Sequence, residues 1–375
     1  MTGLLLALIA YFFFNVDPLE TYRETAKKKD NDKITRKMAE NYRDIGNKLL
    51  VRAEFRAAED AFKTSLDIYP NDLDARYGLM KAQMLKPEEG RKTYTPEVAE
   101  AKLNFLEDVF KSNSTLAEDA FIPYFRGALL KDKNRWDQAR NSFQLSQQRN
   151  RDFIGNYLQL GYMNIIDGKI DDAVGNFCEA LAKAGDHPVA LNNLGALYTV
   201  NLDFDQALEL LKKARGISKR LETYIILGDV YRYKNDIESA IVQHEIAWDM
   251  LNDPKTEEGI NYGVLTYNFM PESPTDTYTN SIAMQFYDLA RHKVLVKYCL
   301  SLDYALKGNL KIAESAFQEG YAADPYINQA KEYGCWYLNQ ITYTLNNVTG
   351  LKGETRQWLE EKKKTLPTHQ TCFGR

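Results

Sequence analysis

The chain has 375 residues, of which 44% are hydrophobic, and it includes 24 Tyr and 17 Phe. This composition supplies enough apolar surface for a packed core and excludes a wholly disordered chain. The net charge of -4 provides no overall basic field, which argues against nucleic-acid binding because that binding gains most of its affinity from phosphate neutralisation.

The chain begins with an uncharged apolar run, GLLLALIAYFFF, over residues 3–14. We predict a membrane-anchor helix over 1–16, although the run is shorter than the about 20 residues that span a bilayer. A cleaved export signal and a helix buried in a larger membrane complex are the alternatives. No Lys or Arg precedes the run, and large aromatic residues at its end occupy the place where a cleavage site needs small residues, which favours a retained anchor over a cleaved signal. The predicted anchor side chains are Leu4, Leu5, Leu6, Leu8, Ile9, Tyr11, Phe12, Phe13 and Phe14.

A charged linker is predicted over 17–38. It carries most of the basic residues near the apolar run, and the positive-inside rule then predicts the rest of the chain on the cytoplasmic or organelle-interior side. A periplasmic or luminal location is the alternative that follows from a cleaved signal. The basic residues are Arg23, Lys27, Lys28, Lys29, Lys33, Arg36 and Lys37.

Small residues recur in mid-chain with a period of 34 or 33 residues. One column holds Gly127, Gly161, Gly195 and Gly228, and a second column, twelve residues later, holds Ala139, Ala173, Ala207 and Ala240. A third column, four residues after each Ala and so on the same helix face, holds Phe143, Phe177, Leu211 and His244. The spacing predicts a repeated unit of two helices.

These columns resemble the signature of the tetratricopeptide repeat (TPR) family. The clearest matches are Leu160-Gly161, Leu194-Gly195-Ala196-Leu197-Tyr198 and Leu227-Gly228-Asp229-Val230-Tyr231, each followed by its Ala and large residue. The resemblance implies an all-α, right-handed superhelical solenoid of about seven helix-turn-helix units, with the first helix of each unit lining a concave groove.

The predicted division of the chain follows from these repeats. The array occupies 39–251, with a degenerate second unit that carries an insertion, and a further unit occupies 283–325. Between them, 252–282 holds three prolines among turn-forming residues and is predicted to be an inserted loop. Residues 326–375 are predicted to form a helical cap and tail.

The concave face is the predicted partner-binding groove. Its candidate residues are Arg43, Asn47, Phe121, Tyr124, Leu158, Tyr162, Ile165, Asn192, Asn193 and Thr199. Arg43 and Asn47 flank Gly46 as two residues do in the clamp by which some TPR proteins hold acidic C-terminal tails. Arg76 and Phe125 break that match in the next two units, so the sequence argues against the clamp. The apolar stripe of the third and fourth units suits an amphipathic helix better, and packing between repeats is the alternative role of these residues.

The sequence contains no recognised catalytic or metal-binding motif. The four His residues form no HExxH motif, and the four Cys residues form no CxxC pair. His244 replaces a core aromatic residue and is predicted to be a buried histidine that a neighbour satisfies. We therefore predict no enzyme activity, cofactor, metal site or small-molecule substrate.

The function that these observations predict is a membrane-tethered scaffold or assembly factor that binds a membrane-associated protein partner through the groove. A structural subunit of a large membrane complex is the alternative, and an exported periplasmic or luminal protein is a second one. TPR grooves vary on a common frame, so the sequence does not name the partner.

Overall fold

The computed structural model describes residues 18–52, 54–85, 96–112, 118–133, 135–253, 265–266, 284–285, 289–323 and 333–366. The predicted anchor over 1–16 lies outside the described residues. So does the predicted loop over 252–282, except for its first two residues and the short strand within it. Both predictions therefore stay predictions.

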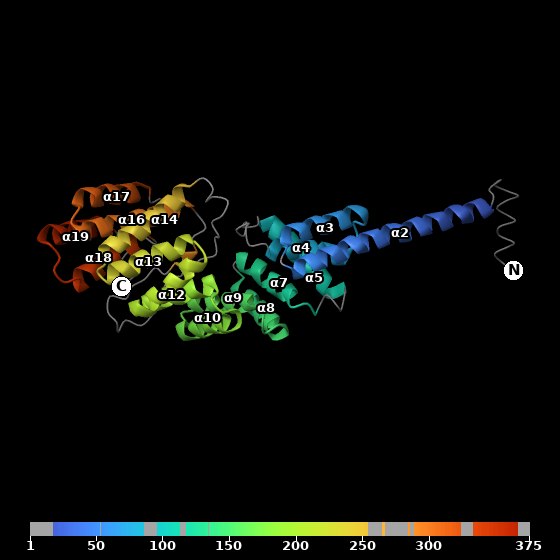
Figure 1. Ribbon diagram of the computed structural model, residues 1–375, viewed down its shortest axis with the longest axis horizontal. Coiled ribbons are helices and arrows are strands. Elements are labelled where there is room, and N and C mark those ends of the chain that lie inside the picture. Colours follow the sequence, from blue (N-terminus) through green and yellow to red (C-terminus); the bar gives the residue numbers. More distant parts are fainter. Residues whose placement is uncertain are drawn as a thin grey trace. The chain divides into compact units, whose positions relative to one another are not determined.

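The chain folds as two compact units, and each is described by itself. Unit 1 comprises Met1–Pro87 and Asn104–Phe121, and unit 2 comprises Glu88–Leu103 and Ile122–Arg375. Unit 1 contains α2 (Pro18–Val51), α3 (Phe55–Ile68), α4 (Leu73–Leu85) and the second half of α5 (Pro96–Ser112). Within unit 1, α2 packs on α3, and α3 packs on α4 (Figure 1).

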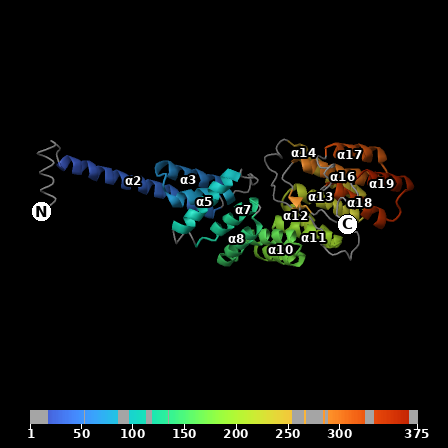
Figure 2. The ribbon, with the colours of Figure 1, turned by 180° about the vertical axis from the view of Figure 1, so that it is seen from behind.

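Unit 2 continues the helix pairs to the end of the described chain. Its helices are α7 (Phe121–Asp132), α8 (Trp136–Arg149), α9 (Ile154–Ile166), α10 (Ile170–Ala184), α11 (Pro188–Val200), α12 (Phe204–Ile217), α13 (Leu221–Tyr233), α14 (Ile237–Asn252), α16 (Leu289–Lys307), α17 (Leu310–Ala323), α18 (Tyr333–Asn347) and α19 (Gly353–Thr365). A two-residue antiparallel pair, β1 (Leu265–Thr266) with β2 (Met284–Gln285), is the strand structure in the described part of the chain. In both ribbon views α14, α16 and α17 lie side by side (Figures 1 and 2).

The glycine column allows the two helices of the mid-chain repeats to pack closely. A Cβ atom added to Gly161 would lie 2.8 Å from the ring of Phe177, and one added to Gly195 would lie 2.6 Å from Leu211. Gly127 meets Phe143 and Gly228 meets His244 in the same way. Only a residue without a side chain permits this approach, and the alanines of the second column are fully buried beside it. The predicted two-helix repeat is confirmed.

The turn inside each repeat has the same register. Seven residues after the glycine position, the backbone turns to a positive φ at Gly168, Leu202, Asn235 and Gly308. This left-handed residue ends the first helix, and the amide of the residue after it bonds back into the last turn, as Lys169 N does to the Asn164 carbonyl at 2.8 Å. The last of these turns belongs to the α16–α17 pair, in which Ser301 stands sixteen residues before Phe317 in place of glycine.

The predicted linker over 17–38 is helical where the structure describes it. Helix α2 runs unbroken from Pro18 to Val51 and therefore joins the charged segment directly to the first helix of the first repeat. Residues 32–38 are all exposed, consistent with their charged composition.

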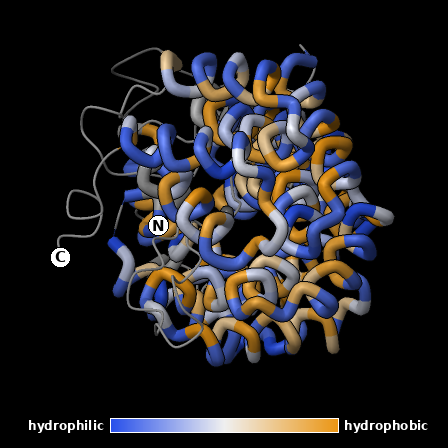
Figure 3. The backbone as a smooth tube through the Cα atoms, turned by 90° about the vertical axis from the view of Figure 1, so that its left-hand side faces the viewer, coloured by the Kyte–Doolittle hydropathy of each residue, from blue (hydrophilic) through white to orange (hydrophobic). Residues whose placement is uncertain are grey.

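In Figure 3, hydrophilic and hydrophobic residues alternate along the helices, as expected for helices that bury one face.

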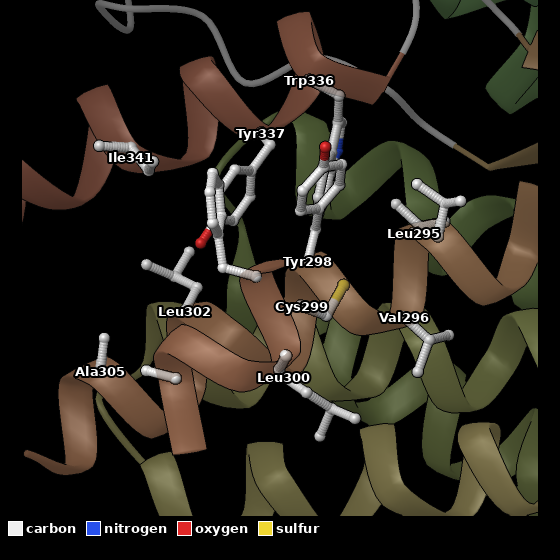
Figure 4. Packing of buried hydrophobic residues seen from close by; sticks show 14 of the residues in the cluster. Leu295, Val296, Tyr298, Cys299, Leu300, Leu302, Ala305, Trp336, Tyr337 and Ile341 are labelled. Carbon is white, nitrogen blue, oxygen red and sulfur yellow. The ribbon is translucent and has the colours of Figure 1, made fainter. Parts of the chain in front are cut away.

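The helices predicted as a cap share one core with the last repeats. Tyr298 on α16 stacks on Tyr337 on α18, with ring centroids 4.5 Å apart, and Figure 4 shows both rings in the space between these helices. Trp358 on α19 meets the ring of Phe317 edge to face at 6.2 Å. Helices α18 and α19 therefore cover the apolar faces of α16 and α17.

Among the helices that the structure describes, none combines the length and the apolar composition needed to cross a bilayer.

Candidate functional site

The first helices of the third and fourth repeats bring several predicted groove residues together. Lys131 on α7 donates to the Gln159 side-chain oxygen on α9 at 3.0 Å, and its ammonium lies 5.3 Å from the ring centroid of Tyr162. Leu158, one residue before Gln159, is half-buried. Tyr124 on α7 lies against Gly155 on α9. We call this set, Tyr124, Lys131, Leu158, Gln159 and Tyr162, the α7–α9 surface.

The predicted groove residues in this region differ in their exposure. Tyr124 and Tyr162 are 7% exposed and Ile165 is 6% exposed, so packing accounts for much of their surface. The Tyr124 ring meets Phe153 edge to face with centroids 4.7 Å apart. Phe121, the first residue of α7, is half-buried and lies in unit 1, where the Lys81 ammonium is 4.1 Å from its ring centroid.

The polar candidates on α11 are engaged inside the chain. Asn192 and Asn193 are at most 5% exposed, and Thr199 is fully buried. The Thr223 hydroxyl donates to the Asn192 side-chain oxygen at 2.8 Å, and the Thr199 hydroxyl donates to the Gly195 carbonyl at 2.8 Å. A peptide could bind the side chains of Asn192 and Thr199 only by exchanging these bonds.

Arg43 and Asn47 lie one turn apart on α2 in unit 1. Arg43 forms an ion pair with Asp72 at 3.0 Å and lies 3.6 Å from Asp74, while Asn47 is exposed. The positive charge of Arg43 is thus already matched within its own unit. This arrangement adds nothing in favour of an acidic-tail clamp.

A cluster of ionisable side chains lies in the core of unit 2, between α13, α14 and α16. We call Asp229, Arg232, His244, Cys299 and Asp303 the buried ionic cluster, since each is at most 2% exposed. The guanidinium of Arg232 donates to Asp303 at 2.8 Å and also contacts Asp229. Nδ1 of His244 lies 2.5 Å from the other oxygen of Asp303. Asp303 therefore joins the two cationic groups.

The contacts of His244 require both of its ring nitrogens to carry protons. Nε2 lies 3.1 Å from the Ile225 carbonyl, which can only accept, while Nδ1 faces the Asp303 carboxylate. Burial by itself lowers the pKa of His244, but the contacts with Cys299 and Asp303 outweigh it and hold the pKa well above its usual value. The imidazolium and the guanidinium of Arg232 then balance two carboxylates.

Cys299, His244 and Asp303 include the residue types of a nucleophilic triad. All three side chains are fully buried, and burial, reinforced by Asp229, raises the pKa of the Cys299 thiol. Reactive cysteines instead have a lowered pKa and are accessible to substrate. The geometry therefore provides no nucleophile for a substrate in solution.

The same cluster has a donor set that could hold a metal ion. Asp229, His244 and Cys299 each place one ligand atom within 4.8 Å of the others. However, the same Asp229 oxygen is contacted by Arg232, and the Nε2 proton of His244 faces the Ile225 carbonyl. A cation would have to displace the guanidinium and remove protons from the imidazole and the thiol. The donor set therefore fits an ion-pair network better than a metal site.

Sequence reasoning found one member of this cluster. The prediction that His244 is a core histidine satisfied by a neighbour is confirmed, but the sequence gives no reason to place Asp229, Arg232, Cys299 and Asp303 beside it. A signal was present, because a buried imidazole in a column of large apolar residues needs polar partners on both nitrogens. The sequence does not say which residues supply them.

Comparisons with known proteins found likenesses of fold only. No known family model matches the chain, and no curated protein matches it. Among solved structures, a chain of the Cut9–Hcn1 hetero-tetramer of the APC/C is 15% identical, with a TM-score of 0.49, over 84% of this chain and 54% of that one. The chain therefore spans about half the length of that structure.

Two other solved structures also combine a low sequence identity with a low TM-score. Yeast Tom70 is 15% identical with a TM-score of 0.40, over 92% of this chain and 58% of that one. A tetratricopeptide repeat protein from Parabacteroides merdae is 10% identical with a TM-score of 0.40, over 88% of this chain and 94% of that one. At these values the likenesses assign no activity to this chain. Its own repeated packing of glycine against a large side chain, with the common turn register, makes the fold a TPR-like array of helix pairs.

Proposed function

We propose that this chain is a non-catalytic scaffold that binds a protein partner at the α7–α9 surface and is held at a membrane by residues 1–16. The proposed binding site rests on a difference in side-chain exposure between the first helices of successive repeats. On α9, Leu158 and Gln159 remain partly exposed. On α13, the residues at the same two positions before the glycine, Ile225 and Ile226, are at most 2% exposed. We therefore place the binding site of unit 2 on α7 and α9.

The chemistry of this surface indicates the class of partner. Leu158 offers apolar contact, Tyr124 and Tyr162 each keep 7% of their surface exposed, and Lys131 places one positive charge beside Tyr162. An amphipathic helix with apolar residues one turn apart and an acidic residue beside them complements this surface.

The experiment that tests the binding site compares two leucine substitutions. Leu158→Arg places a charge on the α7–α9 surface, whereas Leu145→Arg places the same charge on α8, a second helix, where Leu145 is 37% exposed. The full chain and both variants are used to capture partners from gently solubilised membranes, and affinity is then measured with the partner that is recovered. We expect Leu158→Arg to weaken binding roughly tenfold or more, because a buried interface contact is lost and a charge is desolvated.

The Leu145→Arg control separates an effect at the α7–α9 surface from a general effect of an added charge. Leu145→Arg is expected to bind as the native chain does, and circular dichroism must show that both variants keep their helices. Equal loss in both variants, or native affinity in Leu158→Arg, contradicts the proposed site.

A further inference from the structure

Helix α2 carries a stripe of exposed apolar side chains in unit 1. Ile34 is 59% exposed, Met38 50%, Tyr42 38% and Ile45 46%. Their spacing of four, four and three residues places them along one face of the helix. We call these four residues the α2 stripe. Single exposed apolar residues are ordinary, but an exposed row of four on one helix indicates a surface that is covered in the functional protein.

The repeat register explains why this face is apolar. Ile45 and Tyr42 lie one and four residues before Gly46, the glycine of the first repeat. In the three later repeats that carry leucine one residue before the glycine, these residues, Leu160, Leu194 and Leu227, are at most 5% exposed. They are buried because the second helix of the preceding repeat packs on them, as α8 does on α9 and α12 does on α13. In the first repeat, the described part of the chain supplies no preceding second helix.

The charges beside the stripe are self-complementary. Lys37 and Asp44 are exposed, lie seven residues apart and therefore occupy the same edge of the stripe. When a second α2 is laid antiparallel about a two-fold axis near Glu40, Met38 of each copy meets Tyr42 of the other. Ile34 then meets Ile45, and Lys37 meets Asp44 twice over. A parallel pairing in register instead aligns each residue with its own copy and forms no such ion pair.

We propose that the α2 stripe is the interface of an antiparallel homodimer, in which α2 of one copy packs on α2 of a second copy. The second copy supplies the apolar face that the first repeat lacks, and the paired charges select the antiparallel orientation. Because each copy contributes only four apolar side chains, the interface is small and the dimer is expected to dissociate in the micromolar range. This proposal is independent of the α7–α9 surface.

The first test measures the dimer dissociation constant by sedimentation equilibrium of the full chain in mild detergent. Met38→Lys is expected to raise this constant tenfold or more, because two charges are buried at the centre of the interface. Ile217→Lys, at an exposed position of similar character on α12, is the matched control and is expected to leave it unchanged. A native chain that stays monomeric at concentrations up to about 100 micromolar overturns the proposal.

A charge swap tests the orientation and the self-complementarity. Lys37→Asp and Asp44→Lys each turn two attractive contacts into repulsive ones and are expected to raise the dissociation constant about tenfold. The double variant restores opposite charges at each contact and is expected to regain most of the native affinity. Additive loss in the double variant contradicts the pairing of Lys37 with Asp44.

A disulfide experiment tests the geometry directly. Asn41 is exposed and lies next to the proposed two-fold axis, so Asn41→Cys is expected to form a disulfide between copies under mild oxidation, identified by mass spectrometry of the joined peptides. Ile34 lies six residues from the axis, which separates the two copies by about 18 Å along the helix. Ile34→Cys is therefore expected to form no such disulfide. Joining through Ile34→Cys indicates a parallel pair and overturns the proposal.

Deletion of residues 1–16 separates this interface from association through the apolar N-terminal run. The proposal expects the deletion variant to keep the dimer and its sensitivity to Met38→Lys. If the dimer is lost on deletion and Met38→Lys has no effect in the full chain, the apolar run causes association and the α2 stripe does not.

Discussion

At the scale of single residues, His244 occupies the position that Phe143, Phe177 and Leu211 occupy in the other second helices. An aromatic ring there needs only apolar neighbours, but an imidazolium needs anions. Asp303 meets this need, and Arg232 and Asp229 complete the balance of charge. Removing one member of a buried ion pair costs about 3–5 kcal/mol, because the other charge stays buried without its partner.

The protonation of His244 predicts how stability depends on pH. Its pKa is raised in the folded chain, so the folded state holds a proton that the unfolded state releases above pH about 6.5. This contribution to stability is fully present below the unfolded pKa and is lost as the pH rises through the folded pKa. We expect the free energy of unfolding of the native chain to fall between pH 6 and 8, measured by urea denaturation.

The double variant His244→Phe with Asp303→Asn is the control, because it removes the imidazolium together with one carboxylate and keeps the charges balanced. We expect this variant to lose the fall between pH 6 and 8. His187, whose pKa is lowered by burial and by Arg220, contributes a slope of opposite sign that is common to both proteins. An equal pH dependence in both proteins contradicts the assignment to His244.

The glycine column predicts a second effect at this scale. Gly161→Ala adds a Cβ atom 2.8 Å from the Phe177 ring and is expected to cost about 1–3 kcal/mol of unfolding free energy. Gly175→Ala, in the helix α10 of the same repeat, meets no atom within 4 Å. It is expected to be neutral or to stabilise the protein by about 0.5–1 kcal/mol, because alanine favours the helix. Urea denaturation of both variants measures the difference, and equal effects contradict this account.

At the scale of elements, α19 completes the core of the last repeats. Trp358 packs on Phe317, and its indole N–H donates to Glu314 at 2.8 Å. The Lys362 ammonium, one turn later, donates to the same carboxylate at 2.8 Å. The helix is therefore attached to α17 by apolar and polar contacts together.

Trp358→Ala is expected to lower the free energy of unfolding by about 3–5 kcal/mol, because it leaves a cavity against Phe317 and removes the hydrogen bond to Glu314. Urea denaturation followed by tryptophan fluorescence and by circular dichroism measures this loss. Lys364→Ala, at an exposed position of the same helix, is the control and is expected to change stability by less than about 0.5 kcal/mol. A small loss for Trp358→Ala would show that α19 contributes little to the core.

At the scale of the whole molecule, the proposed tether predicts where the protein is found. Residues 1–16 contain the apolar run, and no helix in the described ranges from 18 to 366 is suited to cross a bilayer. Deleting 1–16 is therefore expected to move the protein from the membrane fraction to the supernatant in a flotation assay, while circular dichroism stays unchanged. Unchanged flotation contradicts the tether, whether or not the α7–α9 surface binds a partner.

The repeat itself could be read from the sequence because its causes are local. Each glycine and the large residue that meets it are only sixteen positions apart in the sequence, as in Gly161 and Phe177. The recurrence of such pairs predicts two-helix units without any knowledge of how the units stack. The charged segment before the first repeat was harder, because its composition indicates exposure but does not separate a flexible linker from the exposed part of a long helix such as α2.

By itself, the sequence determined the helix pairs and the burial of His244 in a core position. Only the tertiary structure decided which charges surround that histidine, since Arg232 and Asp303 are 71 residues apart and belong to different repeats. It also decided which predicted groove residues stay partly exposed, as Leu158 does, and which are used inside the chain, as Thr199 is. The physical reason is range: packing within a repeat depends on neighbours along the chain, whereas burial of the concave face depends on what later segments place upon it.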